Sequence, residues 1–270
     1  MALSDRYNEV SSFFRTHLPP ATRFFFIANV ALFLLYWVLS AFVGSGPYNP
    51  FYYLECRPAM VRAGCVWQLA TYAFLHASPM HLFGNMLALW FFGSLAEQRI
   101  GTAAYGRVYI VAALAAGLVH TLLYLRAPAA PAMLGASGAV MAVLVVCAWH
   151  YFDLPVYLIL WPFPLKLGYL VLIFLIIDAL YLIGPGPAGV ANHAHLIGAA
   201  IGFAYVRMGW NGNRSGIGLS RAHQPALWRS IDVWRFQLRA WRRRLWPFGR
   251  RGPARKAKVR TVWDDDYFRR

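Results

Sequence analysis

Long apolar runs separated by short polar stretches occupy most of the chain from residue 24 onward. A helix that crosses a bilayer needs about 20 predominantly apolar residues. Six runs come close to this length and are predicted to be membrane-spanning helices, at 24–44, 79–96, 105–125, 137–152, 167–183 and 193–210. The pattern therefore predicts an all-α membrane protein with a bundle of six transmembrane helices.

The same pattern divides the chain into three parts: a polar N-terminal segment (1–23), a six-helix domain (24–210) and a basic tail (211–270). The first span is longer than the apolar part of a signal peptide and lacks a convincing cleavage site, so we expect it to be retained. Composition agrees with a membrane protein. Hydrophobic residues make up 59% of the chain and charged residues only 13%, whereas a soluble domain carries about 25% charged residues.

The distribution of Lys and Arg predicts the orientation in the membrane. Six spans place both chain ends on the same side. If that side is the cytoplasm, the inner segments hold 23 cations and the outer segments hold 3, namely Arg57, Arg62 and Arg126. Cytoplasmic segments carry the excess of positive charge, so we expect cytoplasmic termini. Arg- and Ala-rich usage favours a bacterial inner membrane.

Most of the net charge of +16 lies in the tail. Within 224–246, apolar residues recur at steps of three and four and mark one helical face: Trp228, Ile231, Trp234, Leu238, Trp241 and Leu245. A basic amphipathic helix with tryptophans is typical of a segment that lies on an anionic lipid surface. We favour this interpretation over binding of nucleic acid.

Four polar side chains are predicted to meet near the outer surface. Spans two, four and six all run from outside to inside, so their first turns lie at one depth. These turns carry the groups His81, Asn85, Ser137 and His195. Each has a structural alternative, because a serine can bond to a backbone carbonyl and a histidine or asparagine can bridge two helices. Their shared depth favours a functional site, since polar groups inside a membrane are costly.

Ser137 and His195 are candidate nucleophile and base. A serine hydroxyl attacks well only when a neighbouring imidazole takes its proton; His193 is a rival base. Small residues at a spacing of four would let spans four and six approach closely: Gly138, Ala142, Ala194, Gly198 and Gly202.

The tetrahedral intermediate of acyl transfer needs hydrogen-bond donors for its oxyanion. His81 and Asn85 lie four residues apart on one helical face and, with the backbone N–H of Ser137, could supply them. Gly135 and Gly138 leave room for a substrate backbone. No acid stands at an obvious position after His195, which predicts a dyad rather than a Ser-His-Asp triad.

A zinc site built from histidines is the competing chemistry. The chain has no H-E-x-x-H motif, and spans two, four and six carry no acid at that depth. We therefore expect neither a metal nor a cofactor. Cys56 and Cys65 share the first outer loop and could form a disulfide or remain two free thiols.

Four motifs resemble those of the rhomboid intramembrane serine proteases: FLHASPMHLFGN (74–85), EQRIG (97–101), LGASG (134–138) and NHAHLIGAAIG (192–202). The family's H-x-x-x-N matches His81 and Asn85. Its G-x-S-G matches Gly135, Ser137 and Gly138, and its A-H-x-x-G matches Ala194, His195 and Gly198, which favours His195 over His193.

The resemblance implies that Ser137 and His195 cut spanning segments of other membrane proteins near the outer face. It also implies lateral access past span five and a lid at 184–191. Three positions depart from the family pattern. Gln68 follows Trp67 where an arginine is usual, Met141 replaces a tyrosine that supports the histidine, and Asp178 lies within span five. A non-catalytic rhomboid-like escort protein and a small-molecule transporter are the rival functions. Intact Ser137 and His195 disfavour the first, and the lack of an inverted repeat disfavours the second.

Overall fold

The computed structural model describes residues 18–208 except 45, 128–129, 158–162 and 184–189. This part of the chain is mostly helical. Its long helices are α2 (Pro20–Val43), α5 (Pro79–Ala88), α6 (Ser94–Ile100), α7 (Thr102–Leu123), α8 (Ser137–His150), α9 (Leu167–Ile183) and α10 (Asn192–Arg207). A π-helical segment, η3 (Leu89–Gly93), joins α5 to α6 without a break.

Each predicted span contains helical structure, and α5, η3 and α6 together occupy the second one. Two of the helices, α2 and α7, are long and apolar enough to cross a membrane by length and composition; α8 and α9 are apolar but shorter. The count of six spans stays a prediction. The predicted N-terminal segment, except its last six residues, and the whole basic tail with its expected helix at 224–246 lie outside the described residues.

Short elements connect the helices. The first loop holds η1 (Pro50–Tyr53), α3 (Pro58–Arg62), α4 (Gln68–Thr71) and η2 (Tyr72–Phe74). Two two-residue strands, β1 (Pro155–Val156) and β2 (Leu165–Lys166), pair antiparallel between α8 and α9. This pair of strands is a small departure from the all-α prediction.

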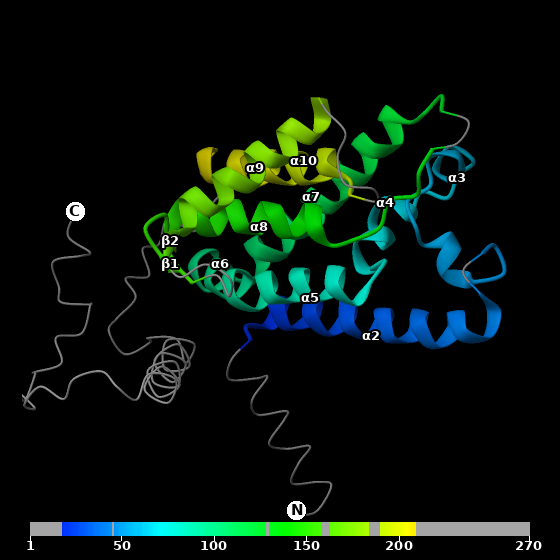
Figure 1. The fold of residues 1–270 in the computed structure, drawn as a ribbon, viewed down its shortest axis with the longest axis horizontal. Helices are drawn as coiled ribbons and strands as arrows, with labels where there is room; N and C mark the ends of the chain where they lie inside the picture. Colours follow the sequence, from blue (N-terminus) through cyan, green and yellow to red (C-terminus); the bar gives the residue numbers. More distant parts are fainter. Residues whose placement is uncertain (1–17, 45, 128–129, 158–162, 184–189, 209–270) are drawn as a thin grey trace, which may run out of the picture. The chain divides into compact units, whose positions relative to one another are not determined.

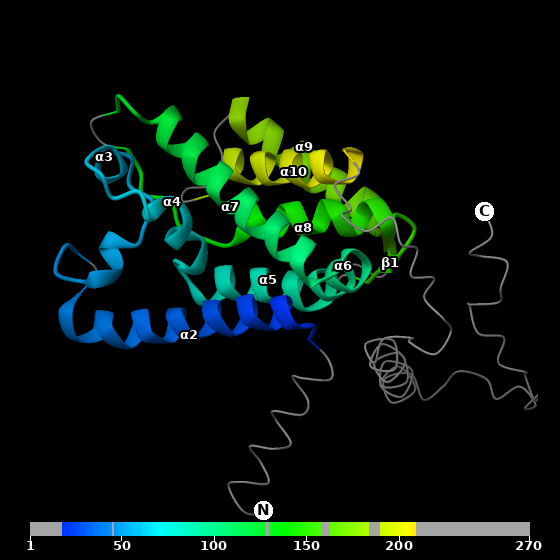
Figure 2. The ribbon, with the colours of Figure 1, turned by 180° about the vertical axis from the view of Figure 1, so that it is seen from behind.

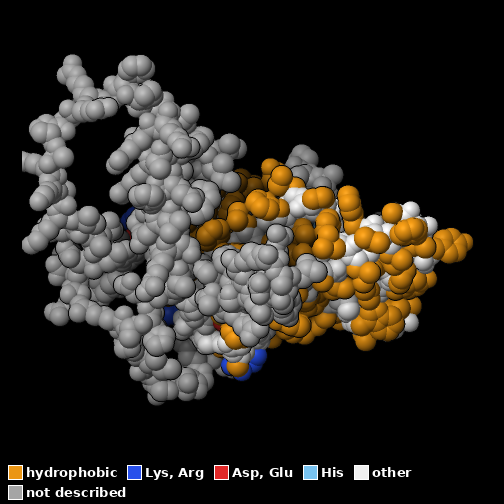
Figure 3. All heavy atoms as spheres, turned by 90° about the horizontal axis from the view of Figure 1, so that it is seen from below, with side chains coloured by type: hydrophobic (Ala, Val, Ile, Leu, Met, Phe, Trp, Pro, Cys, Tyr) orange, Lys and Arg blue, Asp and Glu red, His pale blue; other side chains and the backbone are white. Residues whose placement is uncertain are grey.

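Helix α8 occupies the middle of the bundle. In Figures 1 and 2, α5 and α2 lie on one side of it and α9 and α10 on the other. Every α8 residue from Gly138 to Ala148 is buried. A helix that is apolar all round is one that other elements surround. By contrast, large hydrophobic side chains are exposed along α2 and α9, and Figure 3 shows one broad hydrophobic face.

Helices α8 and α10 approach each other through glycines. A Cβ atom added to Gly198 would collide with the carbonyl group of Gly138, and one added to Gly202 would collide with the carbonyl of Ala142. A Cβ on Gly138 would lie 3.1 Å from the carbonyl oxygen of Ala194. The two backbones therefore touch along the four-residue spacing of small residues, which brings the first turns of both helices together.

The start of α2 is held by a buried carboxylate from the EQRIG motif. Glu97 is 1% exposed and accepts hydrogen bonds from the backbone N–H groups of Ala21 (2.9 Å) and Thr22 (2.7 Å). The hydroxyls of Thr22 and Thr102 donate to it as well, each at 2.8 Å. A carboxylate at a helix N-terminus satisfies unpaired N–H groups and complements the helix dipole. Glu97 thus joins α2, α6 and α7.

The first loop is anchored without the arginine after Trp67 that the resemblance to rhomboid proteases implied. Trp67 Nε1 and Gln68 Nε2 both donate to the carbonyl oxygen of Tyr53, at 2.9 and 3.1 Å, and Gln68 Oε1 accepts from the N–H of Arg57. Cys56 and Cys65 are free thiols, so the disulfide alternative is wrong. Cys56 is buried with its Sγ atom 3.7 Å from Thr121 Oγ1.

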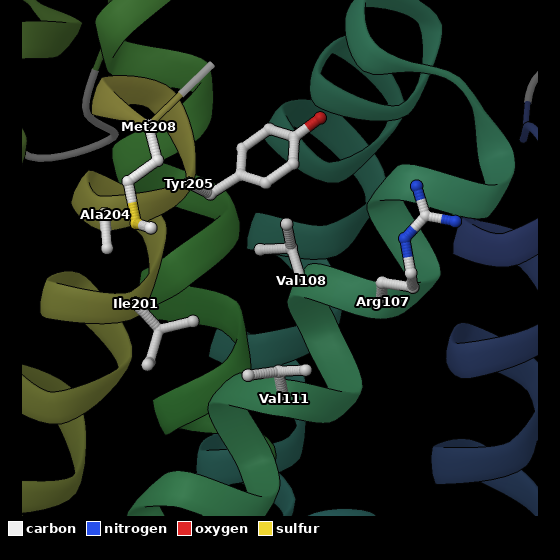
Figure 4. Close-up of a pocket in the computed structure, with 7 residues that line it drawn as sticks. All are labelled: Arg107, Val108, Val111, Ile201, Ala204, Tyr205 and Met208. Carbon is white, nitrogen blue, oxygen red and sulfur yellow. The ribbon is translucent and has the colours of Figure 1, made fainter. Parts of the chain in front are cut away.

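An apolar groove lies between α7 and α10, away from the polar residues of interest. Residues from two turns of each helix line it: Arg107, Val108, Val111, Ile201, Ala204, Tyr205 and Met208 (Figure 4). None of the predicted site residues borders this groove.

Candidate active site

Ser137 is the first residue of α8 and follows a sharp turn in the chain. Gly135, two residues earlier, has φ of +131°, a backbone conformation that side chains other than glycine rarely adopt. Its N–H donates to the carbonyl oxygen of Tyr72 at 3.0 Å, which fixes the turn against the first loop. The backbone N–H of a residue at a helix start has no partner within the helix, so this geometry leaves the Ser137 N–H without a helical acceptor.

His195 faces Ser137 from the first turn of α10. Its Nε2 atom lies 2.8 Å from Ser137 Oγ, a hydrogen-bonding distance. The side chain of His195 is 17% exposed, so the pair is largely shielded. The close backbone contact between Gly138 and Gly198 makes this short distance possible, because each glycine lies within one turn of the residue it helps to position. A hydroxyl next to an imidazole nitrogen is the arrangement that activates a serine.

Asp178 of α9 contacts the other side of the His195 ring. Both carboxyl oxygens lie 3.1 Å from Nδ1, and Asn192 Nδ2 donates to Oδ1 at 2.6 Å. The sequence predicted a dyad because no acid follows His195 at an obvious position, whereas the structure has an acid from earlier in the chain in contact with His195. Asp178 precedes His195 by 17 residues and lies on a different helix, so sequence spacing did not reveal the pairing. The available signal was an acid within an otherwise apolar span.

His193, the rival base, faces another histidine. Its Nε2 atom lies 3.0 Å from Nδ1 of His120, and the two rings stack with 10° between their planes. The second ring nitrogen of His120 lies 3.1 Å from the carbonyl oxygen of Pro131. A carbonyl can only accept, so His120 Nε2 carries a proton and a neutral His120 accepts from His193. His193 is thus engaged away from Ser137.

His81 lies against the turn that precedes Ser137. A Cβ atom added to Gly135 would be 2.7 and 2.8 Å from the Cε1 and Nε2 atoms of His81, and 3.7 Å from Ser137 Oγ. The His81 imidazole and the Ser137 hydroxyl therefore border the same small volume. Only glycine fits at position 135, because any side chain would push the His81 ring away.

Asn85 is oriented by a second histidine, His76, which lies outside the H-x-x-x-N pattern. Its Nδ2 atom lies 3.0 Å from Nε2 of His76, and both residues are buried. Burial lowers the pKa of His76 to about 3, and the nearby His81 adds to the effect. His76 is therefore neutral near pH 7, and its Nε2 accepts one Asn85 hydrogen. The second Nδ2 hydrogen of Asn85 remains for another acceptor.

Met141 is 7% exposed, one turn along α8 from Ser137; its contact with the His195 ring stays a prediction. Among the described residues, no three His, Cys, Asp or Glu side chains are grouped so that they could hold a metal ion. The described polar groups thus form one cluster in which a hydroxyl, two carboxyl oxygens and several ring nitrogens meet at the start of α8 and α10.

The sequence matches a family model described as the Rhomboid domain over residues 63–212. It is 31% identical over 180 residues to RHOMBOID-like protein 4 of Arabidopsis thaliana, covering 64% of this chain and 42% of that protein. It is 29% identical over 167 residues to the mitochondrial RHOMBOID-like protein 12 of the same plant, covering 55% and 48%. The rhomboid protease GlpG of Klebsiella pneumoniae is 35% identical over 54 residues, 20% of each chain. The matches thus span less than half the length of these relatives.

Proposed function

The chain belongs to the rhomboid family, as the resemblance predicted, and we propose that it is an intramembrane serine endopeptidase that cuts transmembrane segments of other membrane proteins. The observation that carries this proposal is the 2.8 Å distance between Ser137 Oγ and His195 Nε2 at the meeting point of two closely packed helices. Ser137 is the proposed nucleophile and His195 the general base and acid.

The proposed reaction has two halves. In the first, Ser137 Oγ attacks the carbonyl carbon of the scissile peptide bond while its proton passes to His195 Nε2. The C–N bond then breaks as the same proton goes to the leaving nitrogen, which leaves an acyl ester on Ser137. In the second half, water gives a proton to His195 and attacks the ester carbon, and the proton returns to Ser137 Oγ as the C–O bond breaks.

Three donors are proposed to hold the oxyanion of each tetrahedral intermediate: the Ser137 backbone N–H, the Asn85 amide and the His81 imidazole. Preorganised donors aimed at a developing charge supply a large part of catalysis in such enzymes. The second Nδ2 hydrogen of Asn85, which has no acceptor among the described residues, and the position of the His81 ring beside Gly135 support these roles.

We further propose six membrane spans within 24–210, with the protease site near the outer face and both termini in the cytoplasm. One contact supports the orientation. Arg99, at the end of α6, lies with its Nε atom 3.4 Å from His150 Nδ1, at the end of α8 opposite Ser137. Arg99, one of the cations predicted to be cytoplasmic, thus lies at the end of α8 opposite Ser137, and this supports the proposed orientation.

Composition and charge support a proposal for the membrane in which the enzyme lies. A bacterial inner membrane is the proposed location. The segment 224–246 would lie on the anionic lipid surface, because its cations flank a face of tryptophans and aliphatic residues. Substrates would be single-pass or multi-pass membrane proteins that reach the site laterally past α9. The lid predicted at 184–191 lies outside the described residues except for its last two positions.

A cleavage assay in proteoliposomes tests the proposal. The wild-type chain, Ser137→Ala and His195→Ala would each receive a single-pass substrate with alanine or glycine near its outer end, with a metal chelator present. We expect cleavage by the wild type alone. Residual activity of the variants should be lower by about a thousandfold or more, because loss of either member disables the activated nucleophile.

Cleavage that survives Ser137→Ala would contradict the mechanism, and loss of wild-type cleavage in chelator would point to a metal. Gel filtration of the wild type and of both variants provides the control for folding. Ser137→Ala removes one half-buried oxygen atom and should leave the elution profile unchanged.

A further inference from the structure

The outer part of α9 buries one side chain, and that side chain is acidic. From residue 172 to residue 183, every residue of which is described, Asp178 is the single buried one. Neighbours such as Ile176 and Leu180 are 58% and 61% exposed. An acid on an apolar helix is costly in a membrane unless it is paired. The burial of Asp178 therefore calls for partners, and these come from α10.

Its partners determine which groups donate and which accept. Asn192 Nδ2 is a donor only, so Oδ1 of Asp178 accepts from it at 2.6 Å. An ionised carboxyl group only accepts, so Nδ1 of His195, 3.1 Å from both carboxyl oxygens, must donate. A neutral imidazole carries one N–H. With the proton on Nδ1, Nε2 has a free lone pair toward Ser137 Oγ, 2.8 Å away.

We propose that Asp178 is a positioning residue that holds His195 in the tautomer able to take the Ser137 proton, and that Asn192 fixes the orientation of the Asp178 carboxyl group. This inference rests on the proposed function of Ser137 and His195. The chain thus has a Ser-His-Asp arrangement assembled from three separate helices, α8, α10 and α9. Asp178 takes up no proton in this scheme. His195 carries one proton from Ser137 to the leaving nitrogen in the first half of the reaction and a second one from water to Ser137 in the second half.

The Asn192 contact makes two substitutions at position 178 behave differently. In Asp178→Asn, the amide oxygen would take the place of Oδ1 and keep accepting from Asn192. The amide nitrogen would then face His195 Nδ1 as a donor, and His195 would have to accept there and carry its proton on Nε2. That tautomer cannot accept the Ser137 proton. In Asp178→Ala, neither tautomer is imposed, so His195 can still adopt the productive one part of the time.

The value of kcat should depend on how much of His195 carries its proton on Nδ1. We expect Asp178→Asn to lower kcat by about a thousandfold to ten-thousandfold with KM within about threefold, in line with the effect of the same change in a soluble triad protease. Asp178→Ala should lower kcat less than Asp178→Asn does, by about a hundredfold. Adding Asn192→Ala to Asp178→Asn frees the amide to rotate and should restore activity by about tenfold, although it removes a further polar group.

The experiment combines three readouts on the full chain in detergent and proteoliposomes. Peptide cleavage gives kcat and KM, and the rate at which a fluorophosphonate labels Ser137 reports nucleophile activation without a peptide substrate. Nitrogen NMR of labelled His195 in the unmodified chain reports which ring nitrogen carries the proton. Asp153→Asn is the matched control, because Asp153 is a half-exposed acid that pairs with Lys166 at 2.6 Å, away from the site.

The proposal is supported if neutral His195 carries its proton on Nδ1 and if the order of kcat and of labelling rates is wild type, Asp178→Ala, Asp178→Asn. It is overturned if kcat of Asp178→Asn lies within threefold of the wild-type value. It is also overturned if Asp178→Ala and Asp178→Asn have equal kcat and the added Asn192→Ala restores no activity, or if NMR places the proton of wild-type His195 on Nε2. The NMR measurement needs no variant, so a substitution that fails to fold leaves the test intact. Cleavage by Ser137→Ala would instead overturn the proposed function, and the two failures are distinguishable.

Discussion

Helix α10 contacts its two neighbours in different ways. Against α8 it presents Gly198 and Gly202, each pressed onto a backbone carbonyl so closely that a methyl group has no room. Against the outer half of α9 it presents His195 and Asn192, which hold one carboxyl group through hydrogen bonds of 2.6 to 3.1 Å. One contact depends on the absence of side chains and the other on two polar ones.

The difference separates two requirements of the site. Lipid tails are as apolar as the helices, so helices associate in a membrane through close packing and hydrogen bonds rather than through the hydrophobic effect. The glycine contact brings the α8 and α10 backbones close together, which allows the short distance from Ser137 to His195. The polar contact sets the direction and the protonation of the His195 ring. Distance and orientation of the same imidazole thus depend on different interfaces.

Breaking the glycine contact should have the largest effect on the folded bundle. In Gly198→Ala the new methyl group would collide with the carbonyl group of Gly138, and the helices would have to separate. Overpacking of this kind costs about 1–3 kcal/mol. We expect a lower thermal unfolding midpoint together with at least a tenfold loss of cleavage, because the shift lengthens the distance from Ser137 to His195.

Gly106→Ala is the control for that substitution. Gly106 lies within α7, and apart from its chain neighbours and the nearby backbone of α7, a Cβ atom there would meet no described atom within 4 Å. Alanine is favoured over glycine in a helix by about 1 kcal/mol, so this variant should be as stable as the wild type or more stable. A Gly198→Ala protein that is as stable and as active as the wild type would show that the contact between α8 and α10 can accommodate a methyl group.

Weakening the contact between α10 and α9 without removing Asp178 should lower cleavage activity to an intermediate extent. Asn192→Ala leaves Asp178 bonded to His195 but removes the 2.6 Å hydrogen bond that orients it. We expect kcat to fall by about tenfold, since loss of a hydrogen bond to a charged group costs about 1.5–3 kcal/mol at most. Steady-state cleavage kinetics measure this, and an unchanged kcat would mean that Asp178 needs no second partner.

The smallest effect is expected from a substitution on the exposed side of α9. Ile176 lies two residues before Asp178 and is 58% exposed. Ile176→Ala removes no contact with α10 that the polar cluster depends on, so unfolding free energy should change by no more than about 0.5 kcal/mol. A loss comparable to that of Gly198→Ala would show that apolar packing, rather than Asp178, holds the outer half of α9.

Apolar runs predicted the positions of these helices to within a few residues. The runs at 79–96, 137–152 and 167–183 correspond to helical residues 79–100, 137–150 and 167–183. Spacing also placed His81 and Asn85 on one helix and small residues where α8 meets α10. The role of Glu97 was not predictable, because its partners Ala21 and Thr22 lie more than 70 residues away. Asp178 could be flagged as an unusual acid, but its partner could not be identified. Periodicity describes one helix at a time, whereas these contacts depend on how two helices are rotated and offset against each other.

The sequence by itself determined that the chain is helical and apolar, that Ser137 and His195 begin helices of the same direction, and that the motifs are those of rhomboid proteins. These features are local, since they depend on residue type and spacing along one segment. Only the tertiary structure decided which histidine faces Ser137, that Cys56 and Cys65 stay apart as free thiols, and that Asp178 supports the His195 ring. Hydrogen bonds form over about 3 Å, and a distance of that order between separate helices is set by packing of the whole bundle.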